Sequence, residues 1–196
     1  MPQVPASYAW LLQEPIAPLM VRVALDAYGT TEVAGAGSNP RILAWADEVA
    51  RTTGRPYDNW AADFYNDDAI PWCGLFMAVV AVRSWQGRPE RLPPRNYLAA
   101  LAWADWGVPC AKTDILVGDV VVLRRQGGGH VTLAVGVTAD GKEFMGLGGN
   151  QSDRVNIARF RTDRIYAVRR PPYRERPAGA RRVVLTATGP LSTNER

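Results

Sequence analysis

The chain has 196 residues, of which 47% are hydrophobic and 21% are charged, and its formal net charge is +4. This composition is typical of one folded domain and excludes wholesale disorder. The uncharged stretch at residues 69–82 is too short to cross a bilayer, and two cysteines with one histidine fit neither a disulfide scaffold nor a zinc motif. We therefore expect no membrane span, no metal and no cofactor.

The charge is unevenly distributed. Residues 1–153 contain 12 Lys and Arg against 16 Asp and Glu, whereas residues 154–196 contain 11 Arg against 3 acidic residues. The basic end indicates either a solvated surface or contact with an anionic polymer. Because no nucleic-acid recognition motif accompanies these arginines, we expect no nucleic-acid partner. No basic segment followed by an apolar core opens the chain, so no secretory signal is expected.

The first half is predicted to be helical. Apolar residues at helical spacing predict one helix within Ile16–Tyr28 and a second over Arg41–Thr53. Asn39 is the expected N-cap of the second helix, Pro40 its first residue and Gly54 its stop. Residues 55–70 are expected to be a loop.

The second half changes character near residue 115. Short β-rich runs separated by glycine-containing turns predict antiparallel strands at residues 119–123, 130–136, 143–147, 154–160 and 165–169. Helices followed by strands predict an α+β fold. We expect one domain over residues 1–176, with a helical part at about 10–110 and a sheet at about 115–172. Residues 177–196 are predicted to be a tail in which Val183–Thr186 is a candidate edge strand.

A candidate nucleophile opens the most apolar helix. Asp67 and Asp68 precede Pro71, and an apolar run follows Cys73. This order predicts a buried helix that starts near Pro71, with acidic side chains at its positive end and Cys73 in its first turn. Free backbone N–H groups there favour the thiolate, which is the nucleophilic form. The competing interpretation is a small buried hydrophobic residue.

The single histidine is the candidate base. His130 follows three glycines, and Gly129 permits close approach of another backbone or a substrate. A histidine at the start of a strand can act as general base for a cysteine on a packed helix, although an exposed loop histidine is the alternative. Either Asn150 or Gln151 could hold the imidazole, unless Gly-Gly-Asn is only a turn.

Four motifs together resemble a known group of enzymes. They are Pro71-Trp72-Cys73, Gly118-Asp119-Val120, His130-Val131 and Leu147-Gly-Gly-Asn-Gln151. This pattern resembles the papain-like cell-wall hydrolases of the CHAP and NlpC-type families, in particular a phage and bacterial branch. The resemblance covers about residues 20–172 and implies a nucleophile helix packed on a five- to six-stranded antiparallel sheet.

The resemblance also implies a reaction and its residues. Cys73 would attack a peptidoglycan amide, His130 would be the base and Asn150 the orienting residue, because Gly148 stands where CHAP enzymes carry a glutamate. If the strand continues past Asn150, Gln151 points to the opposite face, so it is assigned with Trp72 and Gly129 to substrate binding. We expect Trp72 to be a groove wall. Cys110 has no predicted role, and a disulfide with Cys73 would abolish catalysis.

The resulting functional hypothesis is a monomeric cysteine amidohydrolase or endopeptidase. A phage endolysin is preferred, and it would be made in the cytoplasm and act on the cell wall. A secreted or injected antibacterial amidase and a non-catalytic cell-wall-binding relative are the alternatives. Peptidoglycan is the expected partner, and the arginine-rich C-terminal region would contact anionic envelope polymers. The sequence leaves open which amide is cut.

Overall fold

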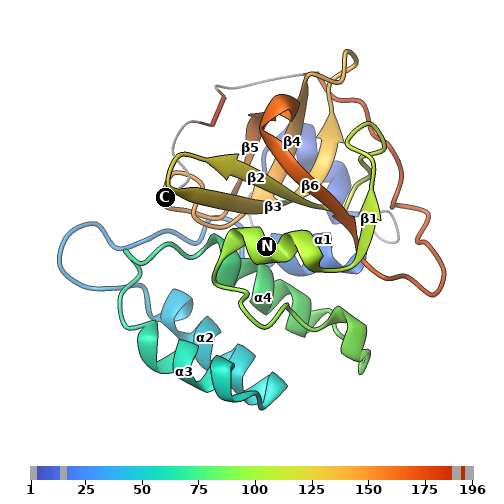
Figure 1. The fold of residues 1–196 in the computed structure, drawn as a ribbon. Helices are drawn as coiled ribbons and strands as arrows, with labels where there is room; N and C mark the ends of the chain where they lie inside the picture. Colours follow the sequence, from blue (N-terminus) through green and yellow to red (C-terminus); the bar gives the residue numbers. More distant parts are fainter. Residues whose placement is uncertain (1–3, 14–16, 187–190, 193–196) are drawn as a thin grey trace.

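The computed structural model describes residues 4–13, 17–186 and 191–192, which form an α+β fold (Figure 1). The α-helices are α1 (Leu19–Leu25), α2 (Pro40–Thr53), α3 (Pro56–Phe64) and α4 (Cys73–Arg83). Four 3-10 helices complete the helical elements of the described residues: η1 (Ala6–Leu12), η2 (Pro89–Arg91), η3 (Ala100–Asp105) and η4 (Thr162–Arg164).

Six strands form one antiparallel sheet in the order β1-β6-β2-β3-β4-β5. The strands are β1 (Val108–Cys110), β2 (Val120–Arg125), β3 (Gly128–Val137), β4 (Glu143–Gly148), β5 (Asn156–Arg161) and β6 (Ile165–Arg170). The five predicted strands are confirmed within a few residues. Strand β1 was not predicted, because it has only three residues, one of them a proline, and it lies at the edge of the sheet, where it pairs only with β6.

Local sequence signals explain the ends of α2. The side chain of Asn39 accepts a hydrogen bond from the backbone N–H of Arg41, Pro40 is the first helical residue, and Gly54 ends the helix with φ of 63°. These are the predicted N-cap, first-turn proline and left-handed C-terminal glycine. The prediction of this helix is confirmed.

The predicted loop at residues 55–70 is wrong, because α3 occupies Pro56–Phe64. Pro56 at the first position favours a helical start. The buried carboxylate of Asp58 accepts a hydrogen bond from Arg55 Nε at 2.7 Å and fixes the first turn. The exposed Trp60 and Phe64 conceal this signal, since the helix carries large aromatic side chains on its solvent-facing side.

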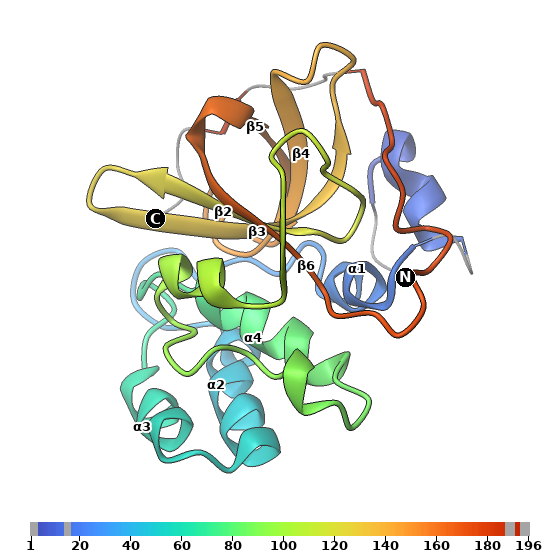
Figure 2. The ribbon, with the colours of Figure 1, turned by 45° about the vertical axis from the view of Figure 1, so that its right-hand side comes forward.

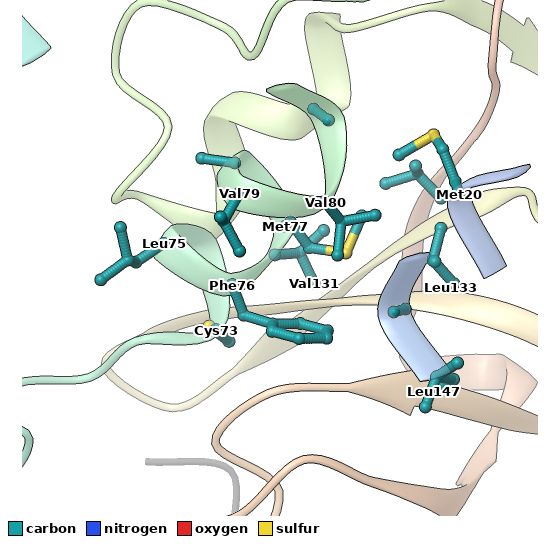
Figure 3. Close-up of a cluster of buried hydrophobic side chains, with 14 of the residues drawn as sticks. Met20, Cys73, Leu75, Phe76, Met77, Val79, Val80, Val131, Leu133 and Leu147 are labelled. Carbon is teal, nitrogen blue, oxygen red and sulfur yellow. The ribbon is translucent and has the colours of Figure 1, made fainter. Parts of the chain in front are cut away.

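Helix α4 lies at the centre of the molecule. It packs against β3 on one side and against α2 on the other, and Figure 2 shows α2 and α3 on the side of α4 that faces away from the sheet. Every residue from Cys73 to Val82 is buried. In Figure 3, Phe76, Met77 and Val80 of α4 lie with Val131 and Leu133 of β3. This apolar contact fixes the start of α4 against the start of β3.

The opposite face of the sheet has an apolar cluster of its own. Phe144 and Phe160 stack with ring centroids 5.3 Å apart, and Leu123 and Ala134 belong to the same cluster. Alternate residues of β3 therefore face two different interiors, one against α4 and one on the far side of the sheet.

Part of the predicted tail packs on the sheet. The backbone N–H of Val137 donates to Val183, and the N–H of Leu185 donates back to Val137, so Val184 forms a parallel bridge there. This local pairing is the structural counterpart of the edge strand predicted at Val183–Thr186. Residues 187–190 and 193–196 of the predicted tail lie outside the described residues.

Candidate active site

Cys73 is the first residue of α4, as the sequence predicts for a residue of its first turn. The neighbouring Gly74 explains how the helix start reaches this position. A Cβ at Gly74 would lie 2.3 Å from the carbonyl oxygen of Tyr97, so only glycine allows the two backbones to pack this closely. Cys73 is buried here, with only 4% of the residue exposed.

Burial dominates the electrostatics of the thiol. It raises the pKa of Cys73, while the backbone amides of Val131 and Gly74 and the charge of Arg125 lower it by less. The expectation that the helix start favours the thiolate is therefore wrong for the net effect in this structure. The amides act in the expected direction, but desolvation of a buried anion outweighs them.

The same amide contact locates the thiol relative to the histidine. Val131 directly follows His130 in β3, and its amide acts on the sulfur of Cys73. The start of α4 therefore meets β3 at the residue after the imidazole. His130 is itself buried, and its ring stacks on Phe160 with centroids 5.6 Å apart. The predicted alternative of an exposed loop histidine is wrong.

Gln151 binds the imidazole. The distance from His130 Nε2 to Gln151 Oε1 is 3.1 Å, and Thr132 Oγ1 donates to the same oxygen at 3.0 Å. The other end of the amide, Nε2 of Gln151, donates to the carbonyl oxygens of Gly146 at 3.2 Å and Asn156 at 2.9 Å. Because carbonyl oxygens only accept, this end must be the NH₂ group, and Oε1 must face the imidazole.

The orientation of Gln151 determines the tautomer of His130. Since Oε1 accepts, the proton lies on Nε2 of the ring, and Nδ1 carries the lone pair in the neutral form. Gln151 thus holds the imidazole at Nε2 in one orientation.

Two glycines of β4 make room for this network. A Cβ at Gly148 would lie 2.5 Å from Gln151 Oε1 and 2.7 Å from Thr132 Oγ1. A Cβ at Gly146 would lie 2.7 Å from Thr132 Cγ2. The amide of Gln151 thus occupies space that any side chain at position 148 would fill, which explains why glycine stands there.

The third position of the predicted triad requires a correction. The sequence predicts Asn150 against the imidazole and Gln151 on the opposite face, but Gln151 makes the contact. The alternation argument failed because β4 ends at Gly148 and Asn150 has φ of 56°, in the left-handed region. The chain turns there instead of continuing as a strand.

The other predicted substrate-binding residues are packed into the protein. Trp72 is 0% exposed, and its Nε1 donates to Glu32 Oε1 at 2.7 Å, so its indole is part of the core and the prediction of an open groove wall is wrong. Gly129 faces the side chain of Leu101, whose Cδ2 would lie 2.8 Å from a Cβ there. The group that approaches Gly129 closely is therefore the side chain of Leu101 and not a substrate.

Asp68 binds at the start of a different helix, and Asp67 binds within its own loop. The buried carboxylate of Asp68 accepts hydrogen bonds from the backbone N–H groups of Val33 at 2.9 Å and Asn39 at 2.7 Å, at the start of α2. Asp67 accepts from the N–H of Ala69 at 2.9 Å. Neither carboxylate lies in the first turn of α4, where the sequence predicts acidic side chains at the positive end of the helix.

Cys73 and Cys110 are both free thiols, so the competing disulfide is not formed. Within the described residues, no three metal-binding side chains cluster, and no helix has the length and apolarity needed to span a membrane. Thr132 and Arg125 belong to the surroundings of the site but were not predicted. The alternation of side chains along the strand that starts at His130 was the available signal for Thr132.

Comparison of the chain with family models, with curated proteins and with solved structures finds no match.

Proposed function

We propose that the chain is a papain-like thiol hydrolase that cleaves an amide bond of peptidoglycan. The hydrogen bond from His130 Nε2 to Gln151 Oε1, at 3.1 Å, carries this proposal, because it orients a buried imidazole beside the strand position that meets Cys73. The order of Cys73, His130 and the Gly-Gly-Asn-Gln motif supports the choice of peptidoglycan through the family resemblance.

In the first step Nδ1 of His130 accepts the proton of the Cys73 thiol as the sulfur attacks the amide carbonyl. Burial keeps the resting thiol protonated, so proton transfer accompanies attack instead of preceding it. Gln151 stabilises the resulting imidazolium through its carbonyl oxygen and keeps the ring in one orientation.

The tetrahedral intermediate then collapses. The imidazolium donates its proton to the leaving amine, the C–N bond breaks, and a thioester remains on Cys73. Water attacks the thioester with His130 as base and releases the carboxylate product. Cys73 is the first residue of α4, and the backbone N–H groups of a first helical turn have no acceptor within the helix. The N–H of Cys73 is therefore our candidate donor to the oxyanion.

One observation favours a second candidate, the non-catalytic binding relative. The thiol of Cys73 is 4% exposed and its pKa is raised, as in an inert structural cysteine. We prefer the enzyme because a buried imidazole, held at one nitrogen by Gln151, serves no evident purpose in a module that only binds. Catalysis then requires a movement that admits the substrate to the sulfur.

A phage endolysin remains our preferred biological role, with an injected or secreted antibacterial amidase as the alternative. The arginine-rich C-terminal region, which includes the exposed Arg174 and Arg176, would contact anionic envelope polymers. Both roles place the activity at the cell wall and act without a metal or cofactor.

Digestion of purified sacculi tests the function. The wild-type protein should release fragments with new amino termini, which mass spectrometry assigns to a bond at the muramic acid or to one within the peptide. Cys73→Ala should release none while keeping the wild-type circular dichroism spectrum. Equal release by the wild type and Cys73→Ala would contradict the thiol mechanism, and no release by the folded wild type would favour the binding module.

A further inference from the structure

The β2–β3 hairpin carries a cation on the face of the sheet that holds the catalytic histidine. Leu123 lies opposite His130 in the register of the two strands, and Arg125 lies two residues further along β2. Side chains two residues apart on a strand share a face, so Arg125 is a diagonal neighbour of His130.

The guanidinium of Arg125 makes one hydrogen bond to the backbone through Nε. Nε of Arg125 donates to the carbonyl oxygen of Gly129 at 3.2 Å, and the side chain is half-buried. Among the described residues, no carboxylate forms an ion pair with it, which leaves its two terminal NH₂ groups for a ligand. The adjacent Arg124 is held differently, over the ring of Tyr166 at 4.0 Å from the centroid.

The backbone beside this cation is uncovered. Gly128 is directly opposite Arg125, and a Cβ built there would meet nothing within 4 Å. The preceding Gly127 is equally open. The positive charge of Arg125 also lowers the pKa of Cys73, although by less than burial raises it.

We propose that Arg125 is the residue that binds a carboxylate of the peptide substrate beside the bond that Cys73 attacks. Two terminal guanidinium N–H groups match the two oxygens of a carboxylate, and a half-buried position strengthens that pairing. This inference rests on the proposed function, since the carboxylate belongs to a peptide of peptidoglycan.

The first test needs no hydrolysis. Cys73 is alkylated with iodoacetate, which is an anion, and with neutral iodoacetamide, and peptide mass spectrometry follows Cys73 separately from Cys110. The ratio of the iodoacetate rate to the iodoacetamide rate should fall about tenfold in Arg125→Gln, because the attracting charge is lost. Arg124→Gln, the matched control, should keep the wild-type ratio. An unchanged ratio in Arg125→Gln would overturn the proposal.

The second test compares muropeptides with a free carboxylate and their carboxamide forms. The wild type should prefer the free acid about tenfold in kcat/KM, Arg125→Gln should lose that preference, and Arg125→Lys should keep part of it. A preference that survives in Arg125→Gln would overturn the assignment. A wild type that shows the alkylation ratio but cleaves neither muropeptide would refute the proposed function and leave the anion site standing.

Discussion

At the scale of single residues, the amide of Gln151 fixes the orientation and the tautomer of His130. Its NH₂ end is fixed by two backbone carbonyls, so its oxygen must face His130 and set the proton on Nε2. This assignment follows from donor and acceptor counting alone. It could not be reached from the sequence, because the position of Gln151 depends on where β4 stops.

We predict that Gln151→Ala lowers kcat by about ten- to a thousandfold while KM changes little, because the imidazole loses its orienting partner.

Gln151→Glu should move the acidic limb of the pH–rate profile to higher pH, since a carboxylate beside Nε2 raises the pKa of the imidazole. The measurement is the pH dependence of sacculus fragment release.

Asn150→Ala is the matched comparison for this prediction, and it should cost less turnover than Gln151→Ala. If Asn150→Ala is instead the damaging change and Gln151→Ala is mild, the orienting role belongs to Asn150.

The raised pKa of Cys73 gives a prediction about stability. The folded thiol keeps its proton at a pH where the unfolded thiol, with an ordinary pKa of about 8.5, has lost it. The free energy of unfolding of the wild type should therefore fall, relative to Cys73→Ala, as the pH rises above about 8.5. Urea titrations of both proteins from pH 7 to 10 measure the difference.

A wild type that instead gains stability over Cys73→Ala as the pH rises would show that the folded protein favours the thiolate. The resting site would then hold an ion pair, and the burial argument for a neutral thiol would fail.

At the scale of elements, the sequence predicts what local signals encode. The caps of α2 and the start of the helix at Cys73 follow from a few neighbouring residues and are confirmed. Helix α3 was not predicted, because aromatic residues on its exposed side hide the alternation of polar and apolar faces by which a surface helix is recognised. The role of Gly148 could not be predicted, because it depends on Thr132 of the neighbouring strand β3 and on Gln151, which reaches it only after the chain turns.

Gly148→Ala should damage the site more than the fold. The new Cβ, 2.5 Å from Gln151 Oε1, would displace that oxygen from His130 and lower turnover at least tenfold. Overpacking of this kind costs about 1–3 kcal/mol. Gly128→Ala is the control, because a Cβ there meets nothing within 4 Å, and it should retain wild-type stability. Thermal unfolding and fragment release measure the two effects, and a Gly148→Ala protein with wild-type turnover would contradict the network.

At the scale of the whole molecule, the α+β order of helices and then strands was predictable from the sequence. The contact that joins β6 to the start of β2 was not. A buried ion pair helps to hold β6 to the start of β2. The carboxylate of Asp119, 1% exposed, accepts from Nε and Nη2 of Arg170, both at 2.9 Å. The sequence shows Asp119 only as part of a Gly-Asp-Val motif, and its partner lies 51 residues away.

Asp119→Asn should destabilise the protein by about 3 kcal/mol, because it leaves the guanidinium of Arg170 without its buried counter-charge. For a chain of this length, this corresponds to a fall in Tm of roughly 6–12 °C. Arg161→Gln is the control, since it breaks an ion pair with Asp163 whose two side chains are exposed, and it should change stability by less than about 0.5 kcal/mol. Equal Tm values for the two variants would refute a structural role for the buried pair.

The central claim is that Cys73 forms a thioester with a peptidoglycan peptide. Acid quenching of the protein within the first turnovers on muropeptides, followed by mass spectrometry, tests this directly. We predict an acyl adduct on the peptide that contains Cys73, with a mass equal to the acyl part of the cleaved substrate, and its absence in Cys73→Ala. Substrate cleavage by a wild type that carries no such adduct, or an adduct on Cys110 alone, would contradict the claim.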